Sequence, residues 1–235
     1  MLRLSDLVNA LPTDAWSSRV GAIARRFDRE FQGQPFEVPE SVEAMPIYQT
    51  WLAGQLSSRV ASPFWELVRP RKGQHGLDLG CGGSFMFYPW RDWDARFYGQ
   101  DVSSSICQMV NSRGPQLNSK LFKGMRHAPA HRIDYDTQQF DWVVSTGVSC
   151  YYPLDYWEQV MTAVKPVLKE GGSFIFDVLD PAQPLAEDWA ILETYLGAEV
   201  ELIDLADWRS HLKSLGVKIQ KEQPGELFHL LKVAL

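Results

Sequence analysis

The spacing of apolar residues along the chain changes character at about residue 74. Before it, apolar residues recur at helical spacing, first from Trp16 to Phe27 and then over about 48–68, which predicts a long helix interrupted near Pro63. After it, short apolar runs alternate with helical patterns, as is typical of a parallel sheet with crossover helices. The pattern therefore predicts a helical N-terminal segment followed by an α/β domain.

Seven strands are expected in the second part. The runs that predict them are 75–80, 95–101, 119–123, 140–145, 173–178, 217–221 and 227–233. Helices are expected over 103–112, over 154–168, and between a capping Asp204 and a terminating Gly216. The last two strands are joined across Pro224 and Gly225, a connection too short for a crossover helix, so they must be antiparallel.

These elements predict an α/β fold with a doubly wound, Rossmann-like, seven-stranded sheet. The sheet is expected to be mostly parallel and to end in a C-terminal antiparallel hairpin. N-terminal helices over residues 1–70 would form an extension or lid, and residues 71–235 would form the ligand-binding domain. Arg19, Arg25 and Arg26 lie outside the apolar positions of the helix around 16–27. We expect that helix to pack on the domain, and contact with a membrane surface is the alternative.

Composition narrows the class of protein. The 235 residues carry 23 Lys+Arg against 29 Asp+Glu, a net charge of −6, so no nucleic-acid partner is expected. No stretch approaches the roughly 18 apolar residues of a membrane span, and the first residues do not resemble a signal peptide. Cys81, Cys107 and Cys150 form no Cys-x-x-Cys pair, which argues against a disulfide framework or a zinc site and favours a cytoplasmic location.

The segment most informative about chemistry follows the first expected strand. There an apolar run leads directly into Gly80-Cys81-Gly82, a glycine turn that allows a ligand to approach the backbone. Asp101 ends the second strand, 21 residues after Gly80, a spacing at which an acidic residue of doubly wound sheets binds ribose hydroxyls. Together these residues predict a nucleoside ligand. Asp101 as a mere cap of the following helix is the alternative.

Residue 85 separates two kinds of nucleoside ligand. The dinucleotide fingerprint Gly-x-Gly-x-x-Gly requires glycine there to pack closely around a pyrophosphate. This chain has Phe85, followed by Met86 and Phe87. A nicotinamide oxidoreductase is therefore disfavoured, and a nucleoside ligand without phosphates is favoured.

Four motifs in order resemble those of the class I S-adenosylmethionine-dependent methyltransferases. They are the segments 77–83 (LDLGCGG), 98–103 (YGQDVS), 140–147 (FDWVVSTG) and 167–174 (VLKEGGSF). The resemblance covers about residues 75–180, and the terminal hairpin corresponds to the sixth and seventh strands of the family. It implies S-adenosylmethionine as cofactor, S-adenosylhomocysteine as product, and a small-molecule methyl acceptor.

The resemblance also implies roles for individual residues. Its cofactor-binding candidates are Asp78, Gly80, Cys81, Gly82, Asp101, Val102, Met125, Ser145 and Thr146. The glycine turn 80–82 would line the methionine part, and Asp78 would orient this turn or reach the ammonium group through water. Asp101 would bind the ribose, Val102 and Met125 would lie at the adenine, and Ser145 and Thr146 would offer backbone groups to the methionine. Its acceptor-pocket candidates are Tyr48, Tyr151 and Tyr152, each of which could instead be core or surface.

The chain departs from the family pattern at two places. Ser84 stands where a third glycine is usual, and no acidic residue follows the third strand, where one often meets the adenine amino group. Both departures bear on cofactor affinity, and they support a second hypothesis, a protein that binds the cofactor or its product without transferring methyl. Metal binding is not expected, because Pro129 separates His127 from His131. The residues identify neither a catalytic group nor the acceptor.

Overall fold

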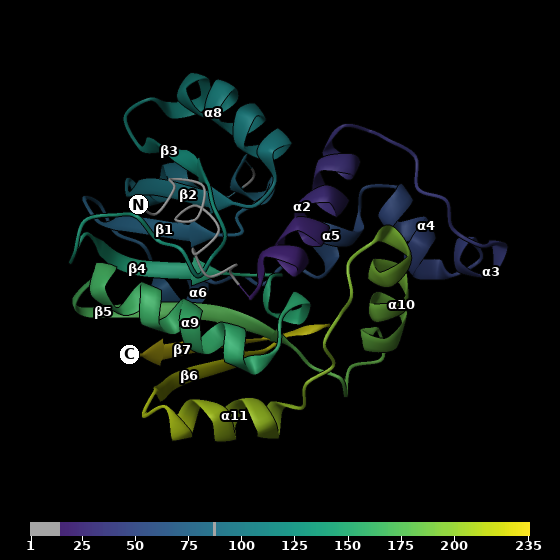
Figure 1. Ribbon diagram of the computed structural model, residues 1–235. Coiled ribbons are helices and arrows are strands. Elements are labelled where there is room, and N and C mark those ends of the chain that lie inside the picture. The colour runs from purple at the N-terminus through teal and green to yellow at the C-terminus, as the bar shows by residue number, and fades with distance from the viewer. Residues whose placement is uncertain (1–14, 87) are drawn as a thin grey trace, which may run out of the picture.

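A computed structural model describes residues 15–86 and 88–235, for residues 85, 90 and 91 the backbone alone. The core of the molecule is one seven-stranded sheet in the order β3-β2-β1-β4-β5-β7-β6 (Figure 1). β1 to β5 run parallel, whereas β7 is antiparallel to β5 and to β6. The predicted fold class is confirmed.

The strands follow the apolar runs closely. They are β1 (His75–Leu79), β2 (Arg96–Asp101), β3 (Phe122–His127), β4 (Phe140–Ser145), β5 (Leu168–Leu179), β6 (Lys218–Pro224) and β7 (Phe228–Ala234). The starts of β3 and β5 differ most from the expected runs, and β3 and β6 also end later than expected, at His127 and Pro224. The third strand begins at Phe122 because the Asn118 side chain accepts hydrogen bonds from the backbone of Lys120 and Leu121 and holds them in a turn. β5 begins at Leu168, and the expected turn near Gly171 is an irregularity within the strand.

The described helices of the α/β part pack on both faces of the sheet, and different helices cover each face. They are α7 (Trp90–Trp93), α8 (Ser104–Asn118), α9 (Leu154–Val164), α10 (Ala186–Leu196) and α11 (Leu205–Ser214), with single 3-10 turns at Ser84–Met86, Ser149–Tyr151 and Lys165–Val167. Residues of α9 and α11, such as Trp157 and Trp208, pack with the Phe174 and Phe176 face of β5. The opposite face, with Ile175, packs with α8.

Four helix predictions need correction. The expected helix over 48–68 is wrong: Gly54, with a φ of +69°, and Pro63 separate shorter pieces. α8 continues to Asn118, beyond the expected end at 112, and the α-helical part of the expected 154–168 helix ends at Val164. Asp204 takes the N-cap position of α11 but makes no capping hydrogen bond with its side chain. α10 was not predicted at all.

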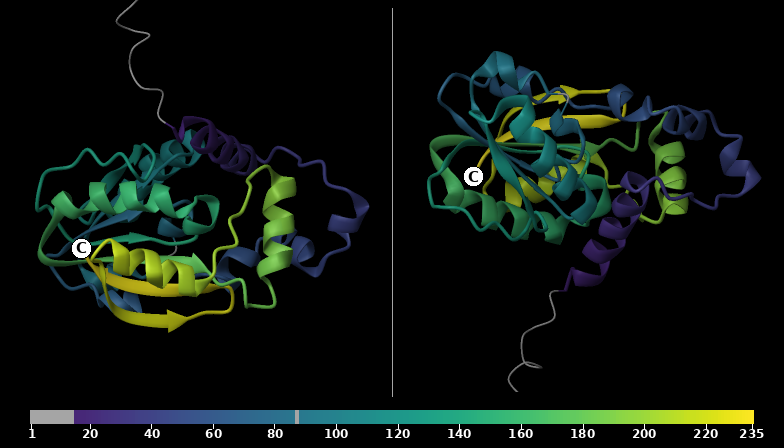
Figure 2. Two further views of the ribbon diagram at one scale, coloured as in Figure 1. Left: turned by 60° about the horizontal axis from the view of Figure 1, so that its bottom comes forward. Right: turned by 90° about the horizontal axis from the view of Figure 1, so that it is seen from above.

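The N-terminal part forms a cover at one end of the sheet. Its described helices are α2 (Ser17–Phe31), α3 (Glu40–Glu43), α4 (Pro46–Leu52), α5 (Leu56–Arg59) and α6 (Trp65–Val68). Figures 1 and 2 show α2, α4 and α5 beside α10 at that end. The apolar residues of α2 contact the main core, Ile23 being buried and Val20 and Phe27 partly so, as expected for a helix that packs on the domain. None of the described helices is long and apolar enough to cross a membrane. Of the expected 1–70 segment, residues 1–14 lie outside the described part.

Candidate functional site

The turn after β1 has the backbone geometry that its glycines predict. Gly80 and Gly82 have φ values of +74° and +50°, a region that side chains disfavour. A Cβ on Gly80 would lie 2.3 Å from Cγ2 of Val148, whereas a Cβ on Gly82 would meet no heavy atom within 4 Å. The turn therefore packs tightly against the loop after β4 at Gly80 and leaves open space beside Gly82.

Asp101 ties this turn to the end of β2. Its Oδ2 accepts a hydrogen bond from the Gly82 amide at 2.9 Å, and its Oδ1 accepts one from the Ser103 amide at 2.8 Å. Burial raises the pKa of Asp101, and these amides offset only part of that shift. The cap of α8 is Ser103, whose Oγ accepts from the Ile106 amide at 3.1 Å. Asp101 thus has a role at the turn besides its contact with the start of α8.

A cavity of about 560 Å³ runs from this turn to the cover helices. Eight of the twelve predicted site residues line it: Gly80, Cys81, Gly82, Asp101, Val102, Thr146, Tyr151 and Tyr152. The other walls come from α2, from the segment 51–65, from α10 and from the start of β7. Residues from both expected halves of the site, for cofactor and for acceptor, therefore face one space.

Four of the predicted residues do not line the cavity. Asp78 is fully buried in β1, where burial raises the pKa of its carboxyl well above the usual range. Met125 is buried, its sulfur 3.8 Å from that of Cys81. Ser145 donates a hydrogen bond to the Leu79 carbonyl at 2.9 Å, which ties β4 to β1. Tyr48 is buried beside Trp51. The roles expected of these four residues stay predictions.

The two cavity tyrosines that follow β4 are held by other aromatic rings. Tyr151 meets Phe27 of α2 edge to face, with ring centroids 5.9 Å apart. Tyr152 stacks on Tyr156 with centroids 3.8 Å apart, and burial raises the pKa of its hydroxyl. Both phenols are therefore neutral donors at physiological pH, not bases.

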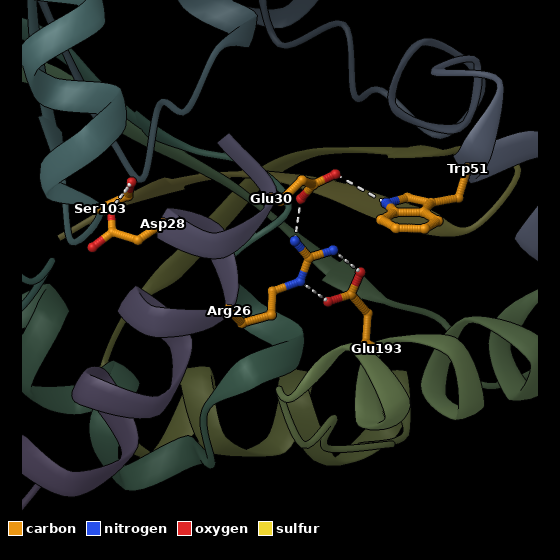
Figure 3. Close-up of polar contacts among 6 residues, drawn as sticks. All are labelled: Arg26, Asp28, Glu30, Trp51, Ser103 and Glu193. Carbon is orange, nitrogen blue, oxygen red and sulfur yellow. Dashed lines mark hydrogen bonds and ion pairs between the residues drawn. The ribbon is translucent and has the colours of Figure 1, made fainter. Parts of the chain in front are cut away.

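A buried ion pair that the sequence did not reveal holds the cover to α10. Arg26 of α2 is 4% exposed and Glu193 of α10 is 2% exposed. Nε and Nη2 of Arg26 donate to the two carboxylate oxygens of Glu193 at 2.9 Å each (Figure 3). Although burial disfavours its charge, the pKa of Arg26 is raised, because Glu193, Tyr151 and Glu30 act on it.

Glu30 and Asp28 of α2 make further contacts, and Figure 3 shows those of Glu30 and the Asp28–Ser103 bond. Glu30 binds Nη1 of Arg26 and accepts from the Trp51 indole at 2.9 Å, which joins α2 to α4. Asp28 accepts from the Ser103 hydroxyl at 2.6 Å and from the Ser105 amide at 2.9 Å, which joins α2 to α8. The helix α2 is thus fixed by carboxylates and a guanidinium to three other helices around the cavity.

Asp177 is the other cavity residue that sequence reasoning missed. It is 1% exposed and lies near the end of β5, where it accepts from the Gly147 amide at 2.8 Å and from the Ser62 hydroxyl at 2.6 Å. Burial raises its pKa to about 7, against the opposing effect of these two donors. The signal in the sequence that could have identified Asp177 is an acidic residue within the apolar run of β5.

The described residues include no group of three or more His, Cys, Asp and Glu side chains placed to hold a metal. Nε2 of His127 lies 2.9 Å from the Val102 carbonyl, and Nδ1 of His131 lies 3.2 Å from the Tyr156 hydroxyl. The two imidazoles therefore have separate local partners. Cys81 is buried, and burial raises the pKa of its thiol well above the usual range, so it is not a reactive thiolate.

The family model described as "Methyltransferase domain" matches residues 77–176. The ubiquinone biosynthesis O-methyltransferase of Roseobacter denitrificans is 29% identical over 133 residues, which cover 56% of this chain and 49% of that protein. The namesake from Ruegeria pomeroyi is 28% identical, over 71% of this chain and 61% of that protein. The chain thus spans about half to three fifths of the length of these two relatives.

Solved structures share the fold at low identity. The geranyl diphosphate C-methyltransferase of Streptomyces coelicolor, in complex with S-adenosyl-L-homocysteine, has a TM-score of 0.64 at 14% identity and covers 94% of this chain and 99% of its own. The magnesium protoporphyrin IX methyltransferase of Synechocystis has a TM-score of 0.59 at 13% identity, over 92% of this chain and 98% of its own. The family match thus covers the segment from β1 to β5 with its glycine turn, and the sheet has the fold of these methyltransferase structures.

Proposed function

We propose that this protein transfers a methyl group from S-adenosylmethionine to a small molecule bound under the cover. The observation that carries the proposal is the single cavity, in which the glycine turn and Asp101 face the same space as the aromatic residues under α2 and α10. Transfer requires donor and acceptor to share one space from which water is excluded, and a cavity of this shape provides it.

The cofactor fits the turn by two features of this chain. The open space beside Gly82 can take a ligand against the backbone, and the buried carboxylate of Asp101 borders it. Asp101 would bind the ribose hydroxyls, Val102 would contact the adenine, and Gly80, Gly82 and Thr146 would hold the methionine part. The cofactor supplies an electrophilic methyl group, so the protein's main tasks are alignment and desolvation.

The acceptor half of the cavity favours a mainly apolar, small molecule. Its walls include Phe27, Trp51, Leu56, Trp189 and Phe228. The charged groups there, on Arg26, Glu30 and Glu193, are already bonded to one another. An acceptor would therefore bind by contact with apolar and aromatic surfaces, with few polar groups fixing its orientation.

The residues 15–70 would act as the cover of this site, as the expected division at residue 70 implies.

We also propose a cytoplasmic location, since Cys81, Cys107 and Cys150 are free and buried thiols, which persist in reducing compartments. The acidic balance of the chain supports a small-molecule acceptor over a nucleic acid.

Calorimetry with S-adenosylmethionine, S-adenosylhomocysteine and NAD, followed by a labelled-methyl screen of cell-extract metabolites, tests the proposal. Binding of both sulfur compounds together with label in a small product is expected. Binding of both without transfer to any fraction would favour the second candidate, a cofactor-binding protein, which the substitution of the usual third glycine by Ser84 motivates. Binding of NAD alone would overturn the proposal.

A further inference from the structure

Four carboxylates of the described residues line the cavity: Glu30 and Glu193 pair with Arg26, Asp101 is assigned to the ribose, and Asp177 has neither an ion pair nor an assigned role. Its two hydrogen-bond donors, the Gly147 amide and the Ser62 hydroxyl, are both neutral. A buried carboxylate with only neutral donors is costly, and an asparagine could make the same two contacts with its oxygen and its amide. The retention of an acid here therefore suggests a task beyond packing.

The surroundings of Asp177 place it between the two halves of the cavity. Gly147 follows β4 directly after Thr146, and both line the cavity on the side of the glycine turn. Ser62 belongs to the cover, and Trp189 and Phe228 are walls of the acceptor half. Asp177 thus occupies the junction at which donor and acceptor would meet.

We propose that Asp177 is a catalytic residue that faces the donor sulfonium and accepts the proton of an acceptor hydroxyl during methyl transfer. The inference rests on the proposed function. In the step, the acceptor oxygen bonds to the methyl carbon while the carbon–sulfur bond breaks, and its electron pair stays on sulfur to give S-adenosylhomocysteine. The hydroxyl proton passes to the Asp177 carboxylate and leaves with solvent after product release.

The electrostatics of the site agree with this role. Burial raises the pKa of Asp177 to about 7, close to the pH at which a general base is most useful. Two titratable groups interact electrostatically with Asp177, the Asp78 carboxyl of β1 and the Cys150 thiol. Asp101 of β2 interacts electrostatically with Asp78. Arg26 lies on the cover wall but is neutralised by Glu30 and Glu193.

The charge difference between cofactor and product gives a test that needs no acceptor. The sulfonium of S-adenosylmethionine favours ionised Asp177 and lowers its pKa, whereas the neutral thioether of S-adenosylhomocysteine does not. Near pH 7, binding of S-adenosylmethionine should therefore release a fraction of a proton that S-adenosylhomocysteine does not release. For a pKa near 7 that the sulfonium lowers by about one unit, the ratio of the two affinities should rise about fivefold between pH 6 and pH 8.

The experiment is calorimetric titration of the full chain with each compound, in buffers of different ionisation enthalpy. In Asp177→Asn the extra proton release should vanish and the affinity ratio should become flat with pH. Ser62→Ala should keep the release but move it to higher pH, because the Ser62 hydrogen bond lowers the pKa of Asp177. Asp180→Asn, at an acid near the same strand end that does not line the cavity, should behave as wild type.

The outcomes distinguish the two proposals. Wild type that binds neither compound contradicts the proposed function itself. Wild type that binds both compounds with the same pH dependence overturns the role of Asp177. Asp177→Asn that keeps the extra proton release overturns it as well, because Asp78 or Asp101 would then be the titrating group. With an acceptor found by the labelled-methyl screen, Asp177→Asn should lower kcat at least a hundredfold and leave the KM for S-adenosylmethionine within a fewfold at pH 6.

Discussion

The two ends of the cavity are built in different ways. At the cofactor end, the wall is a continuous stretch from β1 through the glycine turn, fixed by backbone amides such as those of Gly82 and Ser103. At the cover end, the wall consists of side chains from separate helices, and the Arg26–Glu193 pair joins positions 167 residues apart. The first end depends on backbone conformation. The second end depends on ion pairs between side chains that only the folded chain brings together.

This difference predicts different kinds of sensitivity. A change at the cofactor end should remove ligand binding and leave the fold largely intact, because the sheet carries the stability there. A change in the cover network should weaken the fold, because it leaves a charge buried without its partner. Three sets of variants, ordered by expected size of effect, test that division.

Glu193→Gln should have the largest effect on the free energy of unfolding. It leaves the guanidinium of Arg26 buried with only Glu30 as a counter-charge, and removal of one partner of a buried pair costs about 3–5 kcal/mol. Urea unfolding monitored by tryptophan fluorescence measures the loss. Cofactor binding by the fraction that remains folded should be little changed.

The matched control is Glu222→Gln, which breaks the Arg209–Glu222 pair at the surface and keeps an amide oxygen that can accept from Nε2 of His229, which lies 2.9 Å from the carboxylate. There the side chains are 46% and 29% exposed, and such pairs contribute about 0–1 kcal/mol. Equal losses for the two variants would show that the cover network contributes no more than a surface pair.

Gly82→Val should abolish cofactor binding, a loss of at least about a hundredfold, or about 3 kcal/mol. The side chain would fill the open space beside the turn, and its positive φ adds backbone strain of about 1–2 kcal/mol. Calorimetry with S-adenosylhomocysteine and circular dichroism together separate binding from folding. Gly216→Val, at a φ of +70° with equal open space beyond α11, carries the same strain away from the cavity and should bind normally. Normal binding by Gly82→Val would remove the turn from the cofactor site.

Asp101→Ala should weaken cofactor binding at least tenfold, since charge-assisted hydrogen bonds to hydroxyls contribute about 1.5–3 kcal/mol. Ser103→Ala is the companion variant, because it removes the cap of α8 and the hydrogen bond to Asp28 and leaves Asp101 in place. It should lower stability by about 1 kcal/mol without a change in affinity. Unchanged affinity in Asp101→Ala, with a lowered melting temperature, would mean that Asp101 only supports the turn.

The sequence was informative where structure depends on neighbours along the chain. Apolar runs predict β1, β2 and β4, and with them the position of Asp101 beside Gly82, because parallel strands bring their carboxyl ends together. The start of β3 escaped prediction because a single side chain, Asn118, turns the chain before it.

The cover end could not be predicted for a physical reason. Arg26 on an amphipathic helix has the pattern of a solvent-exposed charge, and only the position of Glu193 on an unpredicted helix makes it a buried one. Asp177 was visible as an acid in a strand, but the run gives no indication that it faces a cavity and meets Ser62.

The linked contacts of Arg26, Glu30 and Glu193 have a consequence for how this protein diverges from its relatives. A lineage that loses Arg26 or Glu193 leaves the other residue buried without its two-bond partner until a second substitution follows, so these two positions should change together or not at all. The apolar residues beside them, such as Ile23, Leu56 and Val60, bear no such constraint, because exchange among similar hydrophobic side chains costs little. Relatives that use other methyl acceptors should therefore differ in the apolar wall of the cavity and keep the ion pairs of Arg26.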